Sequence, residues 1–204
     1  MTKTTPPSRQ TRKAAARASG AAVPWPVISV VAIVVIVVGV IVFATYQTVN
    51  ERNQRVLPIT GLQIFSDLTA GHVTTAVAYD PIPPVGGDHR AVWLNCGIYD
   101  QPVQNELAVH SLEHGAVWIT YRADLAADAV TELRSLVRGR EYAILSPYVD
   151  LPAPVVASAW GLQLRVDDPT DERLSRFLLK YMQGPQTPEP GAACFGGTGT
   201  PILR

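Results

Sequence analysis

Acidic side chains are missing from the N-terminal quarter of this 204-residue chain, whose first aspartate or glutamate is Glu51. The same stretch contains five bases, Lys3, Arg9, Arg12, Lys13 and Arg17. The formal net charge of zero hides this separation, because 17 acids outnumber 12 bases from Glu51 onward and leave about −5 there. A nucleic-acid-binding surface needs clustered Lys and Arg to neutralise phosphates, so this mildly acidic part excludes that class of partner.

Charge of either sign is absent from residues 27–46, which read VISVVAIVVIVVGVIVFATY. A stretch of about 20 apolar residues, at a helical rise of about 1.5 Å, spans the roughly 30 Å hydrocarbon core of a bilayer. Trp25 and Tyr46 lie at its two ends, where aromatic rings favour the headgroup level. The pattern predicts a transmembrane helix, or signal anchor, over residues 25–46. A buried core helix and a cleaved signal peptide are the alternatives.

The five N-terminal bases indicate the orientation of this helix, because cytoplasmic flanks are enriched in Lys and Arg. We therefore expect a single-pass protein of the cell membrane, with its N-terminus in the cytoplasm and its main domain outside. The expected organisation is a disordered basic tail over 1–24, the transmembrane helix over 25–46, a linker over 47–58, an extracytoplasmic domain over 59–183 and a Gly/Pro-rich tail over 184–204.

Cysteine is scarce, since only Cys96 and Cys194 occur, and both lie in the part expected outside the membrane. An even number of cysteines in an oxidising compartment favours a disulfide over two free thiols or a cysteine metal ligand. A Cys96–Cys194 bond would tie the tail back to the domain. In the loop-entropy model it would stabilise the fold by up to about 4–5 kcal/mol.

The sequence also lacks an internal repeat, a phosphate-binding glycine loop and a regular alternation of strands with helices. Short apolar and β-branched runs predict strands over 72–79, 91–95, 116–121, 142–145 and 155–166, the last interrupted at Gly161. Helical spacing predicts helices over 105–114, 125–137 and 171–182.

Capping residues support these helix boundaries. Asn105 is the expected N-cap of the first of them, Gly115 its terminating residue, and Thr170 the N-cap of the last. Strands and interspersed helices without βαβ regularity indicate an α+β domain with a mostly antiparallel sheet and two or three helices.

Histidine is also scarce, and three of the four histidines lie in two short segments around Asp88-His89 and His110-Ser-Leu-Glu-His114. A spacing of four residues brings His110 and His114 within reach of one ion in a helix, about 6 Å apart at Cβ, but not in a strand. The residues His89, His110 and His114, with Asp88 or Glu113 as an oxygen ligand, therefore predict a site for Zn²⁺ or Cu²⁺. The alternative is structural, with each imidazole hydrogen-bonded to a backbone carbonyl or a carboxylate.

The segment from His110 to His114 also fits the H-x-x-E-H pattern of metalloproteases in which two histidines bind zinc and the glutamate is the base. Glu113 would be that base. No third ligand is evident from the sequence, and Glu132, Glu141 and Glu189 are only candidates.

The segment His110-Ser-Leu-Glu-His114-Gly115 is the most specific part of a longer pattern. The pattern also includes Trp93-x-x-Cys96-Gly97-x-Tyr99, Leu145-Ser-Pro-Tyr148, Ala159-Trp160-Gly161 and Pro188-Glu-Pro-Gly191-x-x-Cys194-x-Gly196. It resembles, over about residues 59–197, the bacterial family called domain of unknown function 3105, whose members look typically like membrane-anchored proteins of actinobacteria. That family often has Ser-Gly-x-His where this chain has Gly86-Gly87-Asp88-His89, so His89 matches. The resemblance supports the domain boundaries and the choice of histidines and implies no activity.

These observations favour a membrane-tethered binding or accessory domain over an enzyme. The site expected in it holds a divalent transition metal. One alternative is a purely structural partner for another protein of the cell envelope. The other is a zinc metallohydrolase that uses the H-x-x-E-H segment.

Overall fold

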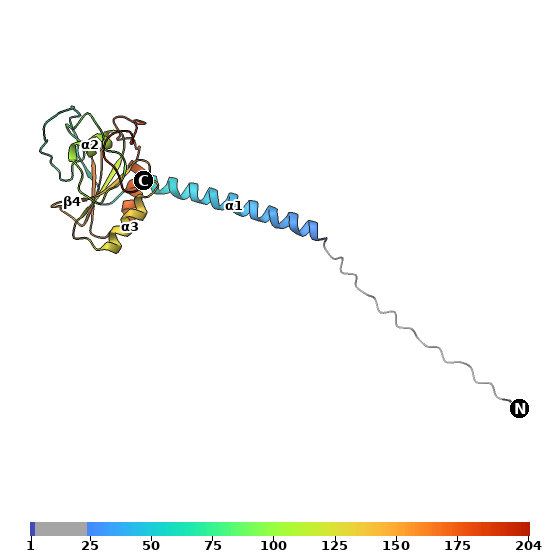
Figure 1. Cartoon of the computed structure of the whole chain (residues 1–204). Coiled ribbons are helices and arrows are strands. Elements are labelled where there is room, and N and C mark those ends of the chain that lie inside the picture. Colours follow the sequence, from blue (N-terminus) through green and yellow to red (C-terminus); the bar gives the residue numbers. More distant parts are fainter. Residues whose placement is uncertain (3–23) are drawn as a thin grey trace. The chain divides into compact units, whose positions relative to one another are not determined.

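A computed structural model describes residues 1–2 and 24–204 of the chain. The chain divides into two units, Met1–Gln47 and Thr48–Arg204, which are described separately. The tail expected over residues 1–24 lies almost wholly outside the described residues. Figure 1 shows the order of the elements along the chain.

The apolar segment forms one helix, α1, over Trp25–Val56. All of its side chains are exposed except that of Gln54, which is partly exposed, and none is buried. By length and composition α1 is apolar enough to cross a membrane. The helix also includes most of residues 47–58, which the sequence suggested as a linker. The polar residues there contain no Gly or Pro before Pro58, so nothing in them ends the helix earlier.

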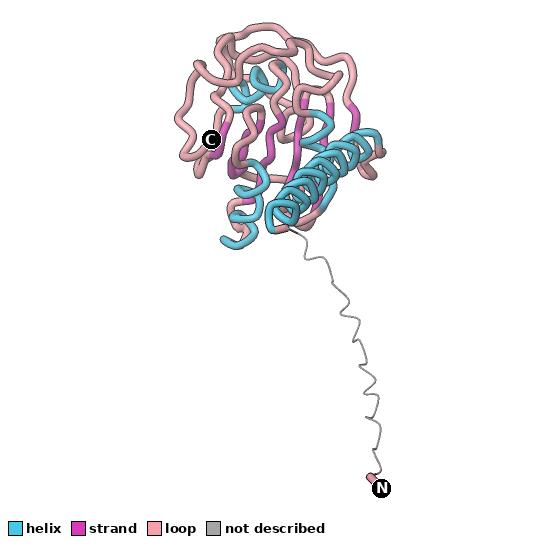
Figure 2. The backbone as a smooth tube through the Cα atoms, turned by 90° about the vertical axis from the view of Figure 1, so that its right-hand side faces the viewer, coloured by secondary structure: helices cyan, strands magenta, loops and turns pink. Residues whose placement is uncertain are grey.

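The second unit contains one six-stranded sheet with the strand order β1-β6-β5-β3-β4-β2. The strands are β1 Gln63–Ile64, β2 Gly97–Ile98, β3 Val117–Arg122, β4 Ala143–Tyr148, β5 Val155–Ala159 and β6 Leu162–Val166. β3 pairs antiparallel with β5, as do β5 and β1 with β6, whereas β4 pairs parallel with both β3 and β2. The predicted α+β class with a mostly antiparallel sheet is confirmed. Figure 2 shows the strands side by side, with loops forming much of the rest of the unit.

Three helices pack on the two faces of this sheet. They are α2 Asn105–Glu113, α3 Ala127–Val137 and α4 Glu172–Tyr181. Successive side chains of a strand point to opposite faces, so Ile119 packs with α3 and α4 while Trp118 packs with α2. Accordingly, α2 and α3 lie on opposite sides of β4 in Figure 1. The sheet is therefore the middle of three layers, and α2 lies on the face opposite α3 and α4 together with loops and the tail.

Two of the expected strands are absent from the structure. In 72–79 only His72 forms a bridge, with His89. Farther along this segment, the Val77 N–H donates to the Glu106 carboxylate rather than to a carbonyl of a neighbouring strand. In 91–95 only Leu94 forms a bridge, with Thr198. Both segments have the residue composition typical of strands, but neither lies beside another strand with which it could pair. The three expected helices and the interruption at Gly161, where φ is +68°, are confirmed within one or two residues.

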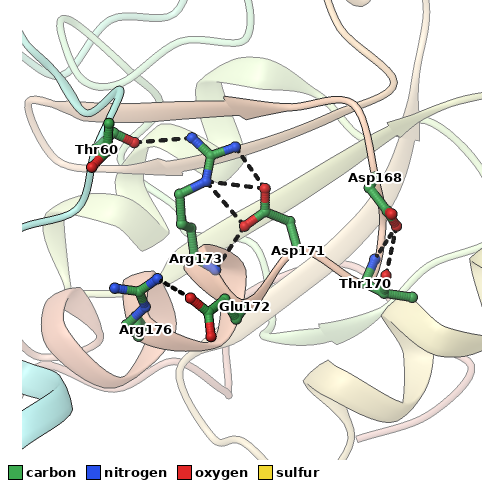
Figure 3. Close-up of polar contacts among 7 residues, drawn as sticks. All are labelled: Thr60, Asp168, Thr170, Asp171, Glu172, Arg173 and Arg176. Atoms are coloured by element: carbon green, nitrogen blue, oxygen red, sulfur yellow. Dashed lines mark hydrogen bonds and ion pairs between the residues drawn. The ribbon is translucent and has the colours of Figure 1, made fainter.

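Both expected N-caps are wrong. The N-cap of α2 is Gln104, which makes no side-chain cap, and the Asn105 amide donates to the Tyr148 hydroxyl instead. The N-cap of α4 is Asp171, because Thr170 turns its hydroxyl to the carboxylate of Asp168 (Figure 3).

The Asp171 cap is reinforced by a guanidinium. Asp171 Oδ1 accepts from the Arg173 backbone N–H at 2.9 Å, and Arg173 Nη2 donates to Asp171 Oδ2 at 2.6 Å (Figure 3). Arg173 Nη1 also donates to the Thr60 carbonyl at 3.0 Å, which joins the start of the domain to α4. These Arg173 hydrogen bonds hold the pKa of the Asp171 carboxyl below its ordinary value of 3.8.

We expect Asp171→Asn to lower the free energy of unfolding by about 1 kcal/mol at pH 7, because a charged cap and its ion pair are lost. A depressed folded-state pKa stabilises the fold above the unfolded pKa, and this stabilisation is lost as pH falls through the folded value. The difference between the two chains should therefore shrink below about pH 4. Denaturant unfolding followed by near-ultraviolet circular dichroism measures it. Glu172→Gln, which removes a neighbouring exposed acid, is the control and should cost less than about 0.5 kcal/mol.

Candidate metal centre

All four histidines of the chain lie together on the α2 side of the domain. The ring centroid of His110 is 5.1 Å from that of His72, 4.9 Å from that of His89 and 4.5 Å from that of His114. One ring belongs to α2, one to the residue that caps its C-terminus, and two to the loops that precede it. We call these four residues the histidine cluster.

Pairing between two loop segments places His72 beside His89. The His89 N–H donates to the Gly71 carbonyl at 2.9 Å, and the Val73 N–H donates to the His89 carbonyl at 2.7 Å. The Asp88 carboxylate strengthens the pairing by accepting from the Gly71 N–H at 3.0 Å. His72 is the member that the sequence did not indicate. Its only signal was that it is the one remaining histidine of a chain with four.

Helix α2 and its C-cap residue supply the other two rings and an acid. His110 and His114 are one helical turn apart, as the sequence predicted, and Glu113 lies beside them. Ser111 turns away from them and donates to the Leu94 carbonyl at 2.7 Å. Gly115 ends the helix at φ +91°, and a side chain there would collide with those of Gln183 and Thr187. The C-terminal tail therefore packs directly against the end of α2.

Three backbone carbonyls determine which nitrogen of each ring carries a proton. The Nδ1 atoms of His89, His110 and His114 lie 2.8, 2.6 and 2.7 Å from the carbonyl oxygens of Gly87, Arg90 and Ala193. A carbonyl oxygen only accepts hydrogen bonds, so each Nδ1 must be the protonated nitrogen. Each Nε2 of the neutral rings therefore carries a lone pair. Metal-binding histidines are oriented in the same way by hydrogen bonds from their other nitrogen.

The lone pairs of these Nε2 atoms point at other acceptors. His110 Nε2 lies 2.9 Å from His114 Nε2, and His89 Nε2 lies 3.0 Å from Glu113 Oε2. His89 Nε2 is also buried and has no hydrogen-bond partner. Two acceptors at such distances repel each other unless a proton or another cation lies between them. The cluster therefore has the electrostatic requirement of a cation site.

Burial makes an additional proton on His110 unfavourable. His89 is 0% exposed, His110 5% and Glu113 6%. Burial lowers the pKa of His110 to about 4. The hydrogen bond to the Arg90 carbonyl acts in the opposite direction and raises this pKa, whereas like charge on the neighbouring imidazoles lowers it further. At neutral pH a metal ion, which accepts a lone pair from each ligand, meets the requirement without a charged imidazolium.

Four residues are close enough to share one ion. The potential ligand atoms of His72, His89, His110 and Glu113 all lie within 4.8 Å of one another. Ligands bound to a tetrahedral zinc ion lie roughly 3.3 Å apart, so small side-chain movements would close the set. His72 is the exposed member, and a surface pocket that also includes Val73 and Arg90 reaches it.

The structure sorts the residues that the sequence singled out. His89, His110 and Glu113 come together in this set. His114 lies outside it but touches His110, and Asp88 points to the Gly71 N–H rather than to the cluster. His89, His110 and Glu113 are therefore the candidate ligands, and His114 and Asp88 border them.

The C-terminal tail completes the surroundings of His114. Cys96 and Cys194 form a disulfide, as predicted, and the neighbouring Ala193 supplies the carbonyl that orients His114. Earlier in the tail, the Glu189 N–H donates to the Glu113 carbonyl at 3.1 Å, and Glu189 Oε2 lies 3.5 Å from His114 Nε2. The disulfide therefore holds a segment that contacts two members of the site.

Comparison with known proteins places this domain in a family without assigning it an activity. The model of the family described as protein of unknown function (DUF3105) matches residues 72–196. The match includes all four histidines, Glu113 and both cysteines. Searches of curated proteins and of solved structures gave no match.

Replacing both cysteines, in Cys96→Ala/Cys194→Ala, should lower the free energy of unfolding by up to about 4–5 kcal/mol, because a long loop is no longer closed in the unfolded chain. Urea unfolding of the full chain in mild detergent measures this loss. Phe195→Ala, an exposed change next to Cys194, is the control and should cost less than about 0.5 kcal/mol. A loss below about 1 kcal/mol in the double variant would contradict this loop-closure account of the bond.

Proposed function

Because this chain belongs to the DUF3105 family, which has no described function, we propose one from the site itself. The domain is a membrane-attached, extracytoplasmic accessory module that binds one divalent transition-metal ion, Zn²⁺ or Cu²⁺. The observation that carries this proposal is the pair of acceptor-to-acceptor contacts, His110 to His114 at 2.9 Å and His89 to Glu113 at 3.0 Å.

The ligands would be the Nε2 atoms of His89 and His110, a carboxylate oxygen of Glu113 and a ring nitrogen of His72. Nitrogen and oxygen ligands without sulfur suit Zn²⁺ and Cu²⁺. The carbonyls of Gly87 and Arg90 would keep the two buried rings in the metal-binding tautomer. Cu²⁺ would bind more tightly than Zn²⁺ at the same ligands, as the general order of divalent affinities requires.

Binding is a better account of this site than hydrolysis. A hydrolytic zinc keeps one coordination position open to water and substrate, with the base beside it. Glu113, the base of the H-x-x-E-H pattern, is buried and lies 3.0 Å from His89, which suits a ligand or its partner. Only His72 of the four-residue set is exposed, so the set leaves little room for a peptide at Glu113.

The placement of the domain rests on α1, the disulfide and the charge of the N-terminal residues. A helix that is apolar enough to cross a membrane, with five bases before it, supports a single pass with the N-terminus in the cytoplasm. The Cys96–Cys194 bond supports an oxidising compartment for the other side. An envelope protein partner would then receive the ion or deliver it.

The first test is the metal content of the full chain, purified in detergent without a metal-affinity column, beside His110→Asn. Asparagine keeps a donor near the position of Nδ1 for the Arg90 carbonyl but removes the Nε2 ligand. We expect close to one equivalent of zinc or copper in the unchanged chain, and affinity at least about 100-fold weaker in the variant. Elemental analysis and competition with a chelator measure the two.

His72→Ala separates metal binding from folding, because His72 is exposed and its loss should not change the stability of the metal-free chain. It should weaken binding by about 10–100-fold. Thr74→Ala, in the same exposed loop, is the matched control and should bind as the unchanged chain does. No bound metal, with no rise in melting temperature on adding either ion, would leave the histidines structural and favour a partner subunit of an envelope complex.

The orientation is tested by reporters fused after Arg204. We expect an alkaline phosphatase fusion to be active and a green fluorescent protein fusion to be dark, because the C-terminus would lie outside, where the phosphatase folds and the fluorescent protein does not. The reverse result would place the domain in the cytoplasm. Replacing the five N-terminal bases with neutral residues should reduce the fraction of chains in the expected orientation.

A further inference from the structure

Potential metal ligands continue in a row beyond the four-residue set of His72, His89, His110 and Glu113. His114 Nε2 lies 2.9 Å from His110 Nε2 on one side and 3.5 Å from Glu189 Oε2 on the other. Glu189 comes from the C-terminal tail, more than seventy residues after His114 in the sequence. His110 therefore borders two groups of ligands, one formed with the loops before α2 and one formed with the tail.

The exposed fraction of the potential ligands is high at both ends of this row and low between them. A closed storage site would not require exposed ligands. His89, His110, Glu113 and His114 are buried, whereas the side chain of Glu189 is 56% exposed and His72 is exposed. The row thus reaches solvent at both ends and is buried between them. Each end carries a single potential ligand, and the two differ in chemistry, an imidazole at one and a carboxylate at the other.

We propose that His110, His114 and Glu189 form a second position for the same ion, and that the ion is exchanged with solvent or a partner through Glu189. This inference rests on the proposed metal-binding function. It makes the domain a device for transferring an ion rather than for storing it.

The transfer is an exchange of ligands in which the ion keeps its charge. Bonds to His72, His89 and Glu113 would break as bonds to His114 and Glu189 form, while His110 Nε2 stays bound and water takes the remaining coordination position. The imidazole nitrogen of His110 has one lone pair to donate, so it serves one ion at a time. Binding should therefore be limited to one ion although two positions exist.

Glu189 is held where this exchange needs it. Its backbone N–H donates to the Glu113 carbonyl. Two residues later, the Gly191 N–H donates to Gln183 Oε1 at 2.8 Å and fixes the tail there. A half-exposed carboxylate attracts a cation from solution. It is also a hard oxygen ligand, which these ions leave more readily than imidazole nitrogen.

The test compares the full chain in detergent with Glu189→Gln, using Cu²⁺ as the probe. Trp93 and Trp160 report binding, because their rings lie 5.1 Å from His114 and 6.1 Å from His89 and bound Cu²⁺ quenches tryptophan emission. Stopped-flow mixing gives the association rate with Cu²⁺ and the dissociation rate into excess EDTA. We expect both rates to fall about tenfold in Glu189→Gln, with Kd within about twofold.

Two further variants make the result specific. His114→Asn keeps a donor for the Ala193 carbonyl and removes the other ligand of the second position, so it should slow both rates as Glu189→Gln does. In the double variant the two rates should be no lower than in either single variant, because both changes remove the same exchange route. Glu132→Gln, an exposed acid on α3, is the control and should leave both rates unchanged.

The outcomes separate this inference from the proposed function. Stoichiometric Cu²⁺ binding with unchanged rates in Glu189→Gln would overturn the inference alone. So would a tenfold weaker Kd at an unchanged association rate, because Glu189 would then be an ordinary ligand of the main position. Absence of Cu²⁺ binding in the unchanged chain would overturn the proposed function and the inference with it.

Discussion

The chemistry of this domain depends on three backbone carbonyls that each accept a hydrogen bond from Nδ1 of an imidazole. Gly87, Arg90 and Ala193 supply them, two from a loop before α2 and one from the tail after α4. A carbonyl cannot donate, so the fold itself determines that Nε2 of each ring is the free acceptor. Without these contacts, the proton of each neutral ring in His89, His110 and His114 could lie on either nitrogen.

The remainder of the fold holds those carbonyls around α2. One face of the sheet packs against α3 and α4, which leaves the opposite face for α2, the loops and the tail. Leu112 and Ala108 anchor α2 on that face, and the Cys96–Cys194 disulfide fastens the tail beside it. The irregular segments are thus supported by a regular layer, which is a common arrangement for binding residues in loops.

The parts of the molecule that follow local rules could be predicted from the sequence. The apolar helix, the α2 segment with His110 and His114 on one side and the break at Gly161 all have short-range signals in composition or spacing. The disulfide followed from the count, because the chain has only two cysteines. The helix caps failed, because Asn105 and Thr170 found other hydrogen-bond partners than the ends of their helices.

The rest of the candidate site depends on contacts between distant segments. The pairing of His72 with His89 joins two irregular loops, so no periodicity reveals it. The approach of Glu189 to His114 depends on where the tail is fastened. The tautomers of the rings depend on carbonyls, which every residue has and which a sequence therefore cannot distinguish.

The gathering of every histidine of the chain into one cluster has a practical consequence for spectroscopy. In a protein labelled only at histidine, each imidazole resonance in a nuclear magnetic resonance spectrum would come from this cluster, with none from elsewhere in the fold. The nitrogen chemical shifts would report directly which ring nitrogen is protonated in His72, His89, His110 and His114. The site can therefore be observed atom by atom in the unaltered chain, without a substitution to assign its signals to a region.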